Sequence, residues 1–104
     1  MSQSFTRVIG GVRPWAITEI PGTDAILAAD PGNTSGGYDI FDFAAATRNS
    51  TLRAQSVLIP GAIGVCWSDY SHDTGNFYLD DFATPHIYEI NINKNLQGTL
   101  VKVC

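Results

Sequence analysis

The fold is decided by the stretch NFYLDDFATPHIYEI at residues 76–90, because an earlier part of the chain repeats its pattern. The earlier copy reads AILAAD at residues 25–30 and, after a polar loop, IFDF at residues 40–43. In each copy an apolar strand ends in aspartate, and the next strand reads apolar, aromatic, acidic, apolar. A repeat period of about 47 to 51 residues is typical of the four-stranded blade of a β-propeller.

Further strand patterns complete each copy to four strands, while no long window keeps apolar residues at helical spacing. Gly and Pro turns separate the strands, because Gly supplies positive φ and Pro fixes φ. An additional strand is expected over residues 5–9, before the first copy. The expected strands of the two copies cover residues 15–20, 25–29, 38–43 and 54–59, then 64–70, 77–80, 87–92 and 98–103.

This pattern predicts an all-β chain of antiparallel four-stranded repeats of the β-propeller blade type, about two blades in all. We expect a single domain over residues 1–104, with internal repeats at approximately 14–59 and 63–104. The hydrophobic content of 44% against 15% charged residues supports a folded domain, since enough apolar surface is present to offset the ordering entropy.

Composition and charge exclude several classes of partner. No apolar run reaches the roughly 18 residues that a membrane-spanning helix needs. The net charge of −4 argues against nucleic acid, whose phosphates demand basic clusters. No Lys or Arg falls between Gln55 and Asn93, so this acidic segment either binds a cation or forms a solvated face.

The start of the chain lacks the basic and apolar segments of a signal peptide. This favours a cytoplasmic protein, or the mature part of a secreted protein placed behind a new Met1.

Candidate ligand-binding residues gather in the segment from Trp67 to His72. An aromatic ring beside polar side chains can line a pocket for a sugar or another small molecule, which makes Trp67, Asp69 and Tyr70 candidates. His72 is a further candidate, since imidazole titrates near neutrality. The alternatives are core packing for the aromatic rings and an exposed loop position for His72.

Aspartates occupy equivalent strand ends in the two repeats. Asp30 ends the second strand of the first repeat, and Asp80 and Asp81 end that of the second. Such carboxylates can converge on a metal ion such as calcium. Alternatively, each one caps the turn that follows it, as aspartate often does.

The stretch from Cys66 to Asn91 resembles a blade of fungal propeller proteins related to gluconolactonase, or to the carboxymuconate cyclase and phosphogluconolactonase group. The resemblance implies a lactonase- or cyclase-type enzyme with a central acidic site. In gluconolactonase-like propellers Glu, Asn and Asp residues from different blades hold a divalent cation. By that resemblance a calcium or zinc site would use Glu19, Asp69, Asn76 and Asp81.

A propeller ring needs about four blades to close, and about two are encoded here. The open faces can be covered if copies form a homo-oligomer, if the chain is part of a larger propeller, or if the units pack as a small β-sandwich. We therefore expect a ligand-binding or structural module that assembles with other copies or blades. The alternatives are the lactonase- or cyclase-type enzyme and a carbohydrate-binding module.

Overall fold

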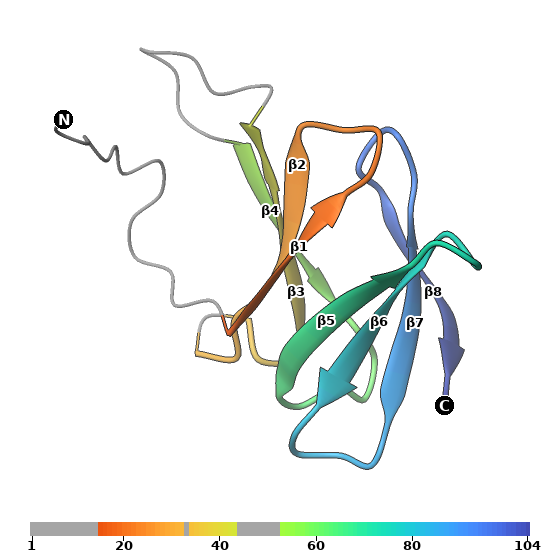
Figure 1. Cartoon of the computed structure of the whole chain (residues 1–104). Helices are drawn as coiled ribbons and strands as arrows, with labels where there is room; N and C mark the ends of the chain where they lie inside the picture. The colour runs from red at the N-terminus through yellow and green to blue at the C-terminus, as the bar shows by residue number, and fades with distance from the viewer. Residues whose placement is uncertain (1–14, 33, 44–52) are drawn as a thin grey trace, which may run out of the picture.

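The computed structural model describes residues 15–32, 34–43 and 53–104, and it contains two four-stranded antiparallel sheets (Figure 1). The first sheet has the order β1-β2-β3-β4 and the second β5-β6-β7-β8. The all-β prediction is confirmed, and the described residues contain no α-helix. The strand expected at residues 5–9 lies outside the described residues. The strands are β1 (Ala16–Ile20), β2 (Ala25–Ala29), β3 (Gly37–Asp42), β4 (Arg53–Leu58), β5 (Val65–Ser71), β6 (Asn76–Asp81), β7 (Ile87–Ile92) and β8 (Gly98–Val103).

The two sheets begin with hairpins whose connections are equally long but whose turns differ in backbone conformation. The turn between β1 and β2 has Gly22 at φ 75°, and the turn between β5 and β6 has Gly75 at φ 73°, which favours glycine at both positions. In the first turn the Ala25 N–H donates to Thr23 Oγ1 at 3.2 Å. In the second, the N–H of the first β6 residue donates to Thr74 Oγ1 at 3.3 Å. The threonine contact therefore repeats at corresponding positions, whereas the positive-φ glycine does not.

Strand register defines which residues of the two sheets correspond. Leu27 pairs with Ile40 in the first sheet, and Tyr78 pairs with Glu89 in the second. Matching the two hairpins makes Leu27 correspond to Tyr78, and Ile40 to Glu89. The repeat in the sequence instead aligned Ile40 with Ile87, which precedes Glu89 on the same face of β7. Relative to that alignment, β3 and β7 are shifted along their length. The side chains that share a face in one strand still correspond to side chains that share a face in the other.

A single hydrophobic core lies between the sheets, which contact each other chiefly through β1 and β2 against β5. At this contact the hydroxyls of Thr18 and Ser68 share a hydrogen bond of 2.6 Å. Tyr38 of β3 is buried in the same core, and its burial raises the pKa of its phenol to about 12. The largest buried side chains of the core are Leu27, Tyr38, Ile40, Val65, Phe77, Leu79, Tyr88 and Ile90.

Each sheet accordingly has one face in the core and one face turned away from it, which we call its outer face. On β1 the core face carries Thr18 and the outer face carries Ile17 and Glu19, because successive side chains alternate. On β5 a bulge shifts the register between Val65 and Trp67. Because of this bulge, Val65 is fully buried in the core while Trp67 is exposed on the outer face.

Candidate functional site

The predicted ligand residues of β5 point to opposite faces of the second sheet. Ser68 and Tyr70 face the first sheet, since Ser68 bonds to Thr18 and the Tyr70 ring packs against the core. Trp67 and Asp69 alternate with them and are exposed on the outer face, with 59% of Trp67 accessible. The strand therefore separates the predicted residues that it carries, with Tyr70 on the inner face and Trp67 and Asp69 on the outer face.

Tyr70 and His72 belong to an aromatic cluster at the end of β5. The Tyr70 ring lies 4.9 Å from the ring of Phe77 and 5.0 Å from that of His72, measured between centroids. Phe77 is buried and His72 is exposed, so Tyr70 bridges the core and the surface. The presence of an aromatic side chain at Tyr70 is therefore explained by its packing against these two rings.

The outer face of the second sheet combines exposed apolar and acidic side chains. Strand pairing sets Trp67 beside Asp80, and Asp80 beside Ile87. The adjacent row across the strands runs through Asp69, Tyr78, Glu89 and Lys102. A mixed surface of this kind can take either another protein surface or a polar ligand with a flat apolar side.

On the same face, the side chains of Asn91, Asn76 and Glu89 form a short chain of hydrogen bonds. Asn76 Nδ2 donates to Glu89 Oε2 at 2.7 Å, and Asn91 Nδ2 donates to Asn76 Oδ1 at 2.9 Å. The Asn76 side chain thus has a donor and an acceptor partner within the sheet. These contacts hold the predicted metal ligand Asn76 in the surface of the sheet.

Asp81 is buried at the end of β6 and fastens the connection between β4 and β5 to the second sheet. Its Oδ1 accepts from the N–H groups of Gly64 and Ala83 and its Oδ2 from that of Ile63, each at 2.9 Å. The Tyr88 hydroxyl donates to Oδ2 at 3.2 Å. Burial opposes ionisation, but the backbone hydrogen bonds outweigh it and lower the pKa of Asp81 to about 2.

Asp30 occupies the corresponding position at the end of β2, where it is also buried. Its Oδ1 accepts from the Gly32 N–H at 3.1 Å, just as Asp81 accepts from Ala83. The interpretation of these aspartates as caps of the following turns is confirmed by these bonds.

The structure does not gather the predicted metal ligands into one site. Glu19 is exposed on β1, Asp69 and Asn76 lie on the outer face of the second sheet, and Asp81 is on its inner face. Among the described residues no group of three or more His, Cys, Asp or Glu side chains is arranged to hold a metal ion. The calcium or zinc site stays a prediction that the resemblance alone supports.

The hydrogen-bond partners of the buried Asp39 side chain in the first sheet were not predicted from the sequence. Asp39 Oδ1 accepts from the hydroxyls of Thr34 and Ser56 at 2.7 and 2.8 Å. By strand register Asp39 corresponds to Tyr88 of the second sheet, whose hydroxyl donates to Asp81. An aspartate in the middle of an apolar strand pattern was the available signal, since a buried carboxylate requires partners.

Trp15 and Phe82 form an exposed aromatic pair that joins the two sheets at one end. Their ring centroids are 5.9 Å apart with planes 17° from parallel, and the side chains are 60% and 64% exposed. A Cβ at Gly64 would overlap the Phe82 ring, so glycine at this position lets the ring lie over the β4–β5 connection.

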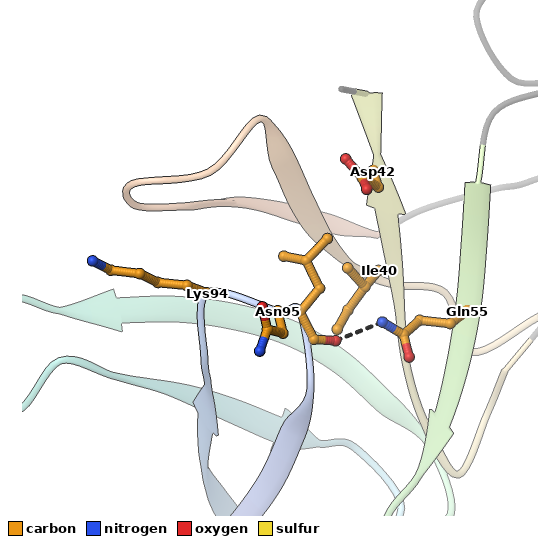
Figure 2. A pocket seen from close by; sticks show the side chains of 6 residues that line it. Ile40, Asp42, Gln55, Lys94 and Asn95 are labelled. Carbon is orange, nitrogen blue, oxygen red and sulfur yellow. Dashed lines mark hydrogen bonds between the residues drawn. The ribbon is translucent and has the colours of Figure 1, made fainter. Parts of the chain in front are cut away.

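A cavity of about 290 Å³ opens between the first sheet and the turn that joins β7 to β8 (Figure 2). Gln55 Nε2 donates to the carbonyl of Leu96, which adopts φ 62°, and Lys94 extends away from both (Figure 2). None of the predicted ligand residues lines this cavity. Its lining residues are Ile40, Asp42, Gln55, Lys94, Asn95 and Leu96.

Comparisons of this chain with protein-family models, with curated proteins and with solved structures found no match. Within the described residues no helix is long and apolar enough to cross a membrane. Inferences about function therefore depend on the geometry of the two sheets.

Proposed function

We propose that this chain is a stacking module of two blade-like sheets, and that the outer face of its second sheet packs on a further four-stranded sheet. One observation carries the proposal: this face corresponds residue by residue to the face of the first sheet that the second sheet buries. Leu27 is fully buried, whereas the corresponding Tyr78 is only half-buried. Ala16 is half-buried at the core, whereas the corresponding Trp67 is 59% exposed.

Burial of this face would remove substantial apolar surface from water. Trp67 is accompanied by Ile87, which is 45% exposed, and by Tyr78 on the strand between them. Contiguous exposed apolar side chains on a sheet favour association, because their transfer from water is favourable. Radial stacking of four-stranded sheets is the arrangement by which propellers cover such faces.

Light scattering on the chain in dilute solution tests the proposal. We expect the wild-type chain to associate, and Trp67→Glu to lower the measured mass to that of a monomer with an unchanged far-UV circular dichroism spectrum. Ile63→Glu is the matched control, since Ile63 is 58% exposed but lies in the β4–β5 connection. A compact wild-type monomer, or a Trp67→Glu variant that associates normally, would contradict the proposal.

Carbohydrate binding is a second candidate, favoured by the exposed Trp67 ring with the carboxylates of Asp69 and Asp80 on neighbouring strand positions. A sugar could stack its apolar side on the indole and donate hydroxyl protons to the carboxylates. In this case Trp67→Ala would abolish glycan binding in calorimetry while the fold is kept. Binding of glycans by a monomeric wild-type chain would favour this candidate over stacking.

The lactonase- or cyclase-type activity is supported only by the resemblance. Its test is turnover of lactones by the wild-type chain and by Asp69→Ala, whose exposed side chain can be removed without opening the core. Absent turnover, or turnover that the substitution leaves unchanged, counts against a role of Asp69 in catalysis.

A further inference from the structure

We infer that the partner of the second sheet is a second copy of this chain, packed head to tail, so that β5 and β6 of one copy lie against β1 of the next. This inference rests on the stacking function proposed above and specifies its partner and orientation. It follows from the contact that already exists between the two sheets of one chain.

The contact inside the chain serves as the template. There β1 and β2 present their core face to the inner face of β5, and the Thr18 and Ser68 hydroxyls share a hydrogen bond across this contact. By register Thr18 corresponds to Asp69, and Ser68 corresponds to Ile17. Repeating the same contact between copies therefore brings the outer face of β5 and β6 against the outer face of β1, with Asp69 near Ile17.

Both of these surfaces are accessible. On β1 the side chain of Ile17 is 58% exposed, and on β5 that of Trp67 is 59% exposed. Trp67 takes the position that Ala16 holds in the internal contact, and Ile17 takes that of Ser68. The hydroxyl pair of the internal contact is thus replaced by Asp69 and Ile17. The apolar gain comes from the neighbouring position, where the indole of Trp67 takes the place of the small Ala16 side chain and is buried on association.

The charges of the two surfaces predict how salt affects the association. Asp69 and Asp80 lie on the second-sheet face, and Glu19 lies on the outer face of β1. These carboxylates repel each other when the surfaces approach, and dissolved ions screen the repulsion. Association should therefore strengthen as the ionic strength increases.

The contact is heterologous, because each copy uses a different surface on each side. Repetition of such a contact closes into a ring when the rotation per copy is suitable, and otherwise continues as a filament. Propellers close with about four to eight blades. With two sheets per copy, a ring of roughly two to four copies falls within that range.

A mixing experiment with two variants tests the orientation. Ile17→Glu blocks the β1 surface and keeps the second-sheet face, while Trp67→Glu does the reverse. Both side chains are more than half exposed, so neither change opens the core, and circular dichroism verifies the fold. We expect each variant alone to be monomeric and the equimolar mixture to form a heterodimer by light scattering, because one intact contact remains possible. Ile63→Glu should associate like the wild type.

Other outcomes overturn the inference in distinguishable ways. If Ile17→Glu associates like the wild type while Trp67→Glu is monomeric, the copies pack second sheet on second sheet, and stacking survives without the head-to-tail contact. If the mixture stays monomeric, the head-to-tail contact is excluded. If the wild-type chain is itself monomeric at low and high salt, the proposed stacking function fails together with the inference.

Discussion

The two sheets have the same strand order, but their corresponding faces differ in how far they are buried. In the first sheet this face carries Leu27 and Ile40, both buried beneath the second sheet. In the second sheet the corresponding positions hold Tyr78 and Glu89, which are only half-buried. Strand order and side-chain alternation are repeated in the two sheets, whereas the composition of each face depends on the surface that it meets.

The buried polar groups of the sheets show the same divergence. The first sheet buries a carboxylate at Asp39 with two hydroxyl partners, and the second buries the Tyr88 phenol with Asp81 as acceptor. In both sheets the buried polar atom has partners, as burial requires. The buried polar residue at corresponding positions can therefore differ in type between the sheets, provided that neighbouring residues supply its hydrogen-bond partners.

Truncation at the corresponding core and outer positions should give the largest difference between the sheets. We expect Leu27→Ala to lower the free energy of unfolding by about 2–5 kcal/mol, because it leaves a cavity in the core. Tyr78→Ala, on the outer face, should cost the isolated chain less than about 1 kcal/mol. Urea denaturation of both variants measures the difference. Equal losses would show that the outer face is already buried in the folded chain.

Acid should weaken the second sheet through Asp81. Its pKa is lowered from 3.8 to about 2 in the folded chain, so its contribution is complete above the unfolded value and is lost as the pH falls through about 2. The shift corresponds to about 2 kcal/mol. Urea unfolding from neutral pH down to about 2 should show the advantage of the wild type over Asp81→Asn shrinking by this amount. A difference that does not change with pH would contradict this assignment.

The hydroxyl contact between the sheets should have the smallest effect. Ser68→Ala removes the hydrogen bond to Thr18 at the edge of the core. We expect a loss of about 1 kcal/mol in the free energy of unfolding. Thr18→Ala should lose about as much, and the double variant little more than either single one, since both changes remove the same bond. Additive losses would mean that the two hydroxyls do not act as a pair.

The strands and their order within each sheet could be predicted from the sequence, because local signals determine them. Short runs rich in apolar residues marked the strands, alternating with polar residues in β1 and β7 and continuous in β2, and Gly22 and Gly75 marked the hairpin turns. The capping role of Asp30 was also among the predictions, since aspartate before Pro-Gly commonly bonds to the following backbone.

The grouping of site residues could not be predicted, because it depends on features without a local signal. The bulge after Val65 turns Trp67 to the outer face, although simple alternation would place both on one side. Asp81 receives hydrogen bonds from Ile63 and Gly64, which precede it by a whole hairpin. Long-range contacts of this kind depend on how the sheets pack, and the repeat pattern alone does not encode them.

The claim that the outer face of the second sheet is a stacking surface is tested most directly by the mass of the chain in solution. Light scattering over a range of concentrations and salt should give a whole-number multiple of the 11.2 kDa chain mass, with the larger species favoured by salt. A compact species of 11.2 kDa under every condition would contradict the account.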